Sequence, residues 1–135
     1  MNSPFYLCWL DDIRSTIESY RGHLDLLKID HEAEFIIDPH YSSDDFGTIA
    51  RNVEDDLIFF IDYNLKNNRG EGLDGHEVIG VIREHNKKCR IVFYSSNATQ
   101  EELRELVQGY DLVNCVLREQ LNDVLTSIAD GSFFE

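Results

Sequence analysis

The stretch LIFFIDYNL, residues 57–65, decides the fold prediction because it joins the most strongly apolar run of the chain to an acid. The five apolar residues Leu57–Ile61 are typical of a strand that is buried on both faces of a parallel sheet. Asp62 follows directly. A carboxylate at the end of a buried strand is costly to desolvate without a partner, so Asp62 is a candidate functional residue.

Apolar runs of this kind alternate along the chain with stretches of helical periodicity. The runs predict strands at Phe5–Leu10, Phe35–Ile37, Leu57–Ile61, Ile91–Tyr94 and Leu112–Leu117. Apolar residues at steps of three and four predict helices over Ile13–Leu27, ending near Lys28, and over Phe46–Val53, Val78–Ile82, Leu103–Val107 and Leu121–Ile128. Five strand–helix units predict one doubly wound α/β domain over residues 1–135, with a five-stranded parallel sheet covered by helices on both faces.

Composition restricts the partners of this domain. The 135 residues include 26 Asp and Glu against 12 Lys and Arg, a net charge of −14 that repels nucleic acid and anionic membrane surfaces. No apolar run approaches the ~18 residues of a membrane span. Three cysteines, which cannot all pair with one another, lie in or beside apolar runs and are predicted to be buried thiols of a cytoplasmic protein.

Polar residues stand where four of the predicted strands end, and ligands bind at that edge of an open α/β sheet. Asp11 and Asp12 follow the first strand, Asp62 the third, Ser95 the fourth and Arg118 the fifth. If the first and third strands are neighbours, their ends lie ~5 Å apart and gather up to three carboxylates into one pocket. Carboxylates that close need a neutralising cation.

Oxygen ligands of this kind suit Mg²⁺, which commonly completes its shell with phosphate oxygens. A carboxylate beside such an ion is also a possible nucleophile toward phosphorus, forming an acyl phosphate. Ser95 and Arg118, from the other side, are placed to hold the phosphoryl oxygens. Two structural interpretations stay open: Asp11 and Asp12 as the cap and first turn of a helix, and Arg118 as the partner of a surface acid.

The pattern FYLCWLDD, LIFFIDYNL with a downstream LDG, IVFYSS and a basic residue after the fifth strand resembles the receiver domain of two-component response regulators. The resemblance covers essentially the whole chain, and the order and spacing of these motifs are specific. It implies a flavodoxin-like sheet with strand order 2-1-3-4-5. It also implies a Mg²⁺-dependent step in which Asp62 accepts a phosphoryl group from a histidine kinase, a phosphotransfer protein or a small phosphodonor.

The same resemblance assigns roles to the other residues at the strand ends. Asp11 and Asp12 match the metal-binding acids, the carbonyl of Asn64 matches a further metal ligand, and Ser95 matches the switch hydroxyl. It implies a signalling domain, not an enzyme, whose chemistry is limited to its own phosphorylation and dephosphorylation. We expect a stand-alone domain that signals through contact with a downstream protein.

The chain departs from the receiver pattern in three places. Arg118 followed by Glu119 replaces the usual Lys and Pro, Cys115 replaces a frequent aromatic residue, and the segment KNNRGEG lengthens the loop after Asp62. Counting back from Arg118 favours Ser96 as the switch hydroxyl, whereas the strand pattern favours Ser95, which we prefer.

These departures motivate an alternative, a pseudo-receiver that binds a partner without being phosphorylated. A third hypothesis is a Mg²⁺-dependent phosphohydrolase. Such enzymes place D-x-D after the first strand, whereas this chain has Asp11-Asp12-Ile13.

Overall fold

A five-stranded parallel sheet forms the centre of the protein, which is described from a computed structural model. The structure describes residues 3–43, 53–65 and 72–135. Its strand order is β2-β1-β3-β4-β5, which confirms the predicted order 2-1-3-4-5. The strands are β1 (Phe5–Leu10), β2 (Phe35–His40), β3 (Ile58–Asp62), β4 (Arg90–Ser95) and β5 (Val113–Leu117).

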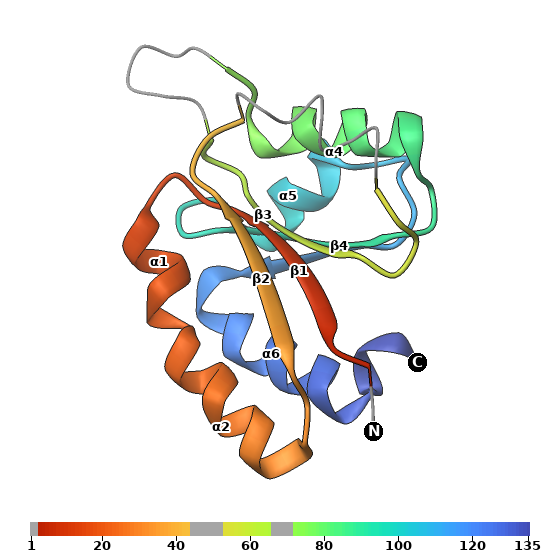
Figure 1. The fold of residues 1–135 in the computed structure, drawn as a ribbon. Coiled ribbons are helices and arrows are strands. Elements are labelled where there is room, and N and C mark those ends of the chain that lie inside the picture. Colours follow the sequence, from red (N-terminus) through yellow and green to blue (C-terminus); the bar gives the residue numbers. More distant parts are fainter. Residues whose placement is uncertain (1–2, 44–52, 66–71) are drawn as a thin grey trace.

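Helices cover both faces of the sheet, as predicted for a doubly wound domain (Figure 1). One face carries α4 (Gly75–His85) and α5 (Gln100–Leu106). The other face carries α1 (Arg14–Ser19), α2 (Arg21–His31) and α6 (Leu121–Asp130). Short 3-10 turns, η1 (Arg118–Gln120) and η2 (Ser132–Phe134), flank α6. The predicted helix over Phe46–Val53 falls almost entirely outside the described residues.

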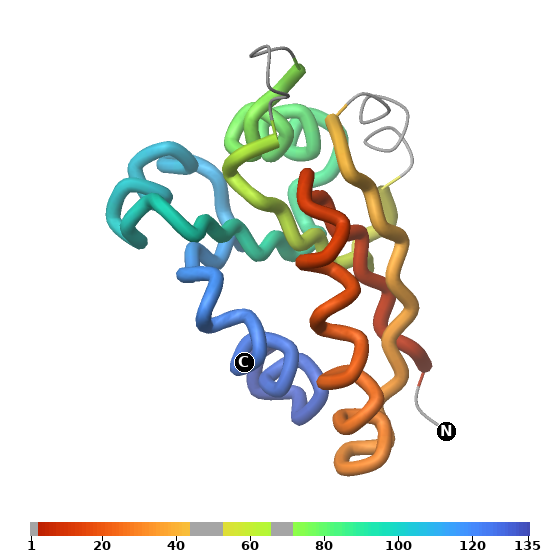
Figure 2. The backbone as a smooth tube through the Cα atoms, turned by 90° about the vertical axis from the view of Figure 1, so that its left-hand side faces the viewer, coloured from red at the N-terminus to blue at the C-terminus, as the bar shows by residue number. Residues whose placement is uncertain are grey.

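Alternation along the strands divides the core into two clusters, one on each face of the sheet. On β1, Cys8 and Leu10 pack on the face covered by α4 and α5, whereas Leu7 and Trp9 pack on the face covered by α1, α2 and α6. Every residue of β3 is buried, as its continuous apolar run predicts. Figure 2 shows α2 lying beside α6, where His23 Nε2 is 3.2 Å from the carbonyl oxygen of Asn122.

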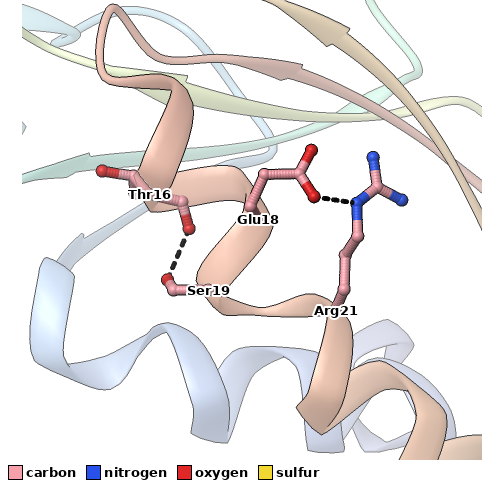
Figure 3. A network of polar contacts seen from close by, with 4 residues as sticks. All are labelled: Thr16, Glu18, Ser19 and Arg21. Carbon is pink, nitrogen blue, oxygen red and sulfur yellow. Dashed lines mark hydrogen bonds and ion pairs between the residues drawn. The ribbon is translucent and has the colours of Figure 1, made fainter.

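The first predicted helix is two helices in the structure. The junction between them is at Tyr20. The amide of Tyr20 donates to the carbonyl of Ile17, and the Ser19 hydroxyl donates to the carbonyl of Thr16 at 2.6 Å. These hydrogen bonds reach back three residues, replace the regular bonds that reach back four, and separate α1 from α2. Figure 3 shows the Ser19 contact and the exposed Glu18–Arg21 ion pair that spans the junction. The second helix continues beyond Lys28 to His31.

Other boundaries also differ from the sequence prediction, among them the start of α1 and the end of β2. Ile13, predicted to begin the buried face of the first helix, is 47% exposed because it precedes α1 as the N-cap. Strand β2 extends beyond Ile37 through Pro39 to His40, which an edge strand tolerates since its outer side needs no hydrogen-bond donor.

Candidate functional site

Three aspartates meet where β1 and β3 end. Asp11 and Asp12 follow β1 directly, and Asp62 is the last residue of β3. These strands are neighbours, with Leu10 opposite Ile61 in the register. One carboxylate oxygen from each of the three aspartates lies within 4.8 Å of the others. The structure therefore brings together the three acids that the sequence predicts to share one pocket.

Burial and mutual repulsion make the ionised state of this cluster unfavourable. Asp11 is 1% exposed and Asp62 is 8% exposed. Burial, followed by the charge of Asp11, raises the pKa of Asp62 to about 7. Burial also raises the pKa of Asp11, although hydrogen bonds from Tyr94 and Ile13 and the charge of Arg118 oppose this increase. Negative charge at this position is therefore only partly compensated by the protein itself.

A buried chain of hydrogen bonds fixes the orientation of Asp11. The indole Nε1–H of Trp9 donates to the Tyr94 hydroxyl at 2.8 Å, and that hydroxyl donates to Asp11 Oδ2 at 2.6 Å. The amide of Ile13 donates to the other oxygen, Asp11 Oδ1, at 2.8 Å. Each carboxylate oxygen of Asp11 thus accepts one hydrogen bond and keeps a further lone pair that is free to bind another group.

The backbone after β3 holds Asp62 in place. The amide of Asn64 donates to Asp62 Oδ1 at 3.3 Å, and the amide of Tyr63 donates to the carbonyl of Tyr94 at 2.9 Å. The first residue of α4, Gly75, donates its amide to the carbonyl of Tyr63 at 2.9 Å. A Cβ atom at Gly75 would lie 2.4 Å from the Asp62 carbonyl oxygen, so only glycine allows this approach. The LDG motif therefore places the start of α4 against the acidic site.

Ser95 is the last residue of β4 and is 1% exposed. Its Oγ accepts hydrogen bonds from the amides of Asn97 and Ala98, each at 3.1 Å. The strand pairs Asp62 with Tyr94, so Ser95 lies one position beyond the residue opposite Asp62. Ser96, the alternative hydroxyl, is exposed in the turn that follows. Ser95 thus stands at the strand end, and its role as the switch hydroxyl stays a prediction.

Arg118 begins the 3-10 turn after β5, and its guanidinium Nη2 donates to the hydroxyl of Thr16 in α1. The Tyr20 hydroxyl donates to the carbonyl of Arg118 at 3.4 Å. The positive charge of Arg118 lowers the pKa values of Asp11 and Asp62 against the larger effects that raise them. Arg118 also lines a pocket of about 520 Å³. The other residues that line it are Tyr20, Ser95, Ser96, Leu117 and Glu119.

The contacts do not support the two purely structural interpretations, in which Asp11 or Asp12 caps a helix and Arg118 pairs with a surface acid. The N-cap of α1 is Ile13, not Asp11 or Asp12. Arg118 hydrogen-bonds to Thr16 and not, among the contacts of the described residues, to a surface carboxylate.

Cys115, where receivers often carry an aromatic residue, packs in the core beneath α5, and its carbonyl accepts a hydrogen bond from Gln100. The inserted KNNRGEG segment lies outside the described residues except for its last glycine.

Tyr94 and Thr16 contact the site residues, although the sequence pattern does not identify them as parts of the site. The pattern places Tyr94 only in the fourth strand, yet a buried tyrosine needs a hydrogen-bond partner, and that requirement is a usable signal. Thr16 is 2% exposed on α1, and nothing in the sequence connects it to Arg118, which follows 102 positions later. Both contacts depend on how distant segments pack.

The donor set fits Mg²⁺. All three side chains offer carboxylate oxygen, the ligand that hard divalent cations prefer. Burial, and after it the charge of Asp11, raises the pKa of Asp62, and an adjacent cation would oppose this increase because positive charge favours the ionised form of a carboxyl group.

Comparison with solved structures relates this arrangement to known proteins. A response regulator from Thermotoga maritima aligns with a TM-score of 0.67 and 15% identity, over 99% of this chain and 100% of that one. A response regulator receiver protein from Sinorhizobium medicae WSM419 aligns with a TM-score of 0.68 and 16% identity, over 98% and 96% of the two chains. A BeF3-activated DrrB receiver domain aligns with a TM-score of 0.68 and 14% identity, over 98% of both chains.

Comparison of sequences finds no matching family model and no matching curated protein. Among the described residues, no helix is long and apolar enough to cross a membrane. At sequence identities of 14–16% these neighbours establish the fold of the chain. The chemistry of the site is inferred from the residues of this chain. The protein has the flavodoxin-like fold of response regulator receiver domains.

Proposed function

We propose that this domain accepts a phosphoryl group on Asp62 in a Mg²⁺-dependent step and signals through contact with another protein. The donor is the phosphohistidine of a histidine kinase or phosphotransfer protein, or a small donor such as acetyl phosphate. The observation that supports the proposal is the convergence of Asp11, Asp12 and Asp62 at one sheet edge, within reach of the charge of Arg118. Receiver folds among the structural neighbours add support from similarity.

The carboxylates of Asp11, Asp12 and Asp62 and the carbonyl of Asn64 are the residues that would hold Mg²⁺. The ion supplies positive charge that neutralises the carboxylates and the phosphoryl oxygens. In its absence the pKa of Asp62, about 7, leaves much of the carboxyl protonated near neutral pH, and a protonated carboxyl is a poor nucleophile. The electrostatics of this chain thus support the proposed dependence on Mg²⁺.

Asp62 performs the covalent step. One of its carboxylate oxygens attacks phosphorus, the new O–P bond forms an acyl phosphate, and the N–P bond of phosphohistidine breaks with its electron pair returning to the imidazole. Ser95 Oγ only accepts in its two hydrogen bonds to backbone amides, so its own O–H serves as a donor to a phosphoryl oxygen. Arg118 uses one guanidinium nitrogen for Thr16 and has further N–H donors for phosphate.

A mass measurement tests the proposal. Incubation of the intact chain with Mg²⁺ and acetyl phosphate is expected to add the mass of one phosphoryl group, and chelation of the metal is expected to prevent it. Asp62→Asn is expected to remove the addition, whereas Asp25→Asn, which changes an exposed acid of α2, is expected to retain it. Addition of the same mass to Asp62→Asn would contradict the proposal.

One contact favours the pseudo-receiver alternative. The Arg118 guanidinium is bonded to Thr16, a role that supports the packing of α1 against the turn after β5. In that alternative Arg118→Met lowers stability and acetyl phosphate adds no mass to the wild-type chain. An Asp62-dependent mass increase eliminates it.

Location and partners belong to the same proposal. The three cysteines are buried and free, as is typical of proteins in a reducing compartment, which supports the cytoplasm. The net charge of −14 supports a protein partner and argues against direct binding to nucleic acid.

A further inference from the structure

A second group of ligating side chains lies on the strand pair β1–β2. The register places Cys8 of β1 opposite Asp38 of β2, and His40 stands two residues beyond Asp38 on the same face of β2. A sulfur, a carboxylate oxygen and an imidazole nitrogen from these three residues lie within 4.8 Å of one another. Three ligands of different chemical type thus meet on one rigid sheet surface.

This group is separate from the aspartate site. Cys8 packs in the core cluster on the face covered by α4 and α5. Asp11 accepts from Tyr94, which packs in the cluster on the opposite face. The side chains of Cys8 and Asp11 therefore lie on opposite faces of the sheet. The two groups meet only through the backbone, where the amide of Asp11 donates to the carbonyl of His40 at 3.0 Å, so side-chain substitutions distinguish them.

Burial changes gradually across the three residues. Cys8 is 1% exposed, whereas the side chains of His40 and Asp38 are 22% and 69% exposed. His40 Nε2 lies 2.9 Å from Asp38 Oδ2, so the imidazole and the carboxylate already approach each other closely. One side of the group is accordingly formed by the core and the other is open to solvent at the sheet edge.

Sulfur, nitrogen and oxygen together are the ligand types of Zn²⁺, which binds cysteine, histidine and carboxylate in four-coordinate sites. Mg²⁺ and Ca²⁺ prefer oxygen alone, so this donor set distinguishes the group from the aspartate site. We propose that Cys8, Asp38 and His40 bind Zn²⁺, or a divalent transition metal of similar chemistry, with a fourth position open to solvent.

Charge balance supports the proposal. A thiolate, a carboxylate and a neutral imidazole carry two negative charges, which a divalent ion cancels, and a neutral site is compatible with the buried end of the group. Without metal, burial and the charge of Asp38 raise the pKa of the Cys8 thiol, so the sulfur holds its proton. Metal binding breaks the S–H bond, forms the S–metal bond and releases the proton to solvent.

Titration of the intact chain with Co²⁺, which substitutes for Zn²⁺ and absorbs light, tests the site. Thiolate ligation is expected to give a sulfur-to-cobalt charge-transfer band, and Zn²⁺ is expected to abolish it by displacement. Cys8→Ala is expected to remove the band, whereas Cys89→Ala and Cys115→Ala, which alter the other two buried thiols, are expected to keep it. Circular dichroism confirms that each variant is folded.

Two further variants test His40 as a ligand and separate this site from the proposed phosphorylation site. His40→Gln is expected to weaken Co²⁺ binding by about tenfold or more. Asp62→Asn is expected to leave the charge-transfer band and its affinity unchanged. The proposal is overturned if folded wild-type protein gives no band, if the band survives Cys8→Ala, or if it depends on Asp62.

Discussion

Tyr94 is the residue on which the geometry of the acidic site most depends. Its hydroxyl lies between the indole of Trp9 and the carboxylate of Asp11, and all three residues are about 1% exposed or less. A buried hydroxyl in such a chain gains from both contacts, and its loss leaves the carboxylate without its strongest neutral donor. In the proposed metal site Tyr94 contacts Asp11 and not the ion, so we propose it as a positioning residue.

Tyr94→Phe is expected to weaken Mg²⁺ binding by about tenfold, because removal of an outer hydrogen bond to a ligand costs affinity of this order. Isothermal titration calorimetry of the metal alone measures the change without any phosphodonor. Tyr110→Phe, which removes the hydroxyl of an exposed side chain between α5 and β5, is the matched control and is expected to bind Mg²⁺ as the wild type does. Equal affinity for Tyr94→Phe and wild type would refute the positioning role.

At the scale of elements, α4 is tied to the site at its beginning and to the opposite end of the sheet at its last turn. The beginning is Gly75, whose approach to Asp62 leaves no space for a side chain. The last turn contains Arg83, which is 5% exposed although it is charged. Each end of the helix therefore has a residue whose type is fixed by packing.

Gly75→Ala is expected to destabilise the protein by about 2 kcal/mol and to reduce the phosphorylation of Asp62, because the added methyl displaces the backbone that carries it. The methyl would lie 2.4 Å from the Asp62 carbonyl oxygen and 2.9 Å from the Cα of Tyr63. Urea denaturation and the mass assay measure the two effects.

Gly22→Ala in α2 is the control, since nothing lies within 4 Å of its added methyl. There the substitution is expected to stabilise the helix by about 0.5–1 kcal/mol. If Gly75→Ala changed neither stability nor phosphorylation, the start of α4 would be able to move and accommodate the methyl group, and the prediction would be wrong.

Arg83→Met is expected to lower stability by about 3 kcal/mol while leaving the phosphorylation of Asp62 intact. The guanidinium donates to the carbonyls of Asn86, Cys89 and Asp111 at 3.1, 2.8 and 2.9 Å, which joins α4 to the segments that precede β4 and β5. Replacement with an apolar side chain leaves these carbonyls without their donor.

Arg104→Met, at an exposed position of α5, provides the comparison and is expected to change stability little. Chemical denaturation of both variants measures the difference. If the two variants were equally stable, the packing of the methionine side chain would compensate for the lost hydrogen bonds of the Arg83 guanidinium.

At the scale of the whole molecule, the acidic site makes folding depend on pH. Asp62 has a pKa of about 7 in the fold against an ordinary value of 3.8, so the folded chain binds more protons between these values. The stability that Asp62 contributes to the metal-free protein is then fully present below about pH 4, is lost as the pH rises toward 7, and does not return above it. The difference between these two pKa values corresponds to about 4 kcal/mol at most.

Denaturation with urea at about pH 5 and about pH 8, in the presence of a chelator, is expected to show lower stability at the higher pH. Asp62→Asn cannot ionise, so its loss of stability between the two pH values is expected to be smaller. Mg²⁺ is expected to raise the stability of the wild type at pH 8, by about 2.7 kcal/mol at a concentration of one hundred times Kd. An equal pH dependence for Asp62→Asn would contradict the assignment of the shift to Asp62.

Local sequence patterns are sufficient to predict the layer architecture and the acids of the site. Continuous apolar runs such as that of β3 specify strands buried on both faces. Parallel strands end at one edge of the sheet, so the positions of Asp11, Asp12 and Asp62 along the chain already imply that they lie together. The same reasoning predicts Ser95 at the end of the fourth strand, because a strand boundary follows from local hydrophobicity.

Which distant side chains meet depends instead on tertiary packing. The chain from Trp9 through Tyr94 to Asp11, the bond between Arg118 and Thr16, and the group of Cys8, Asp38 and His40 all join residues from separate elements. Hydrophobic periodicity records which face of an element is buried, and it carries no information on which polar atom of another element lies opposite. That pairing is fixed by register and close packing, and these in turn set the pKa of Asp62 and the chemistry that the site can perform.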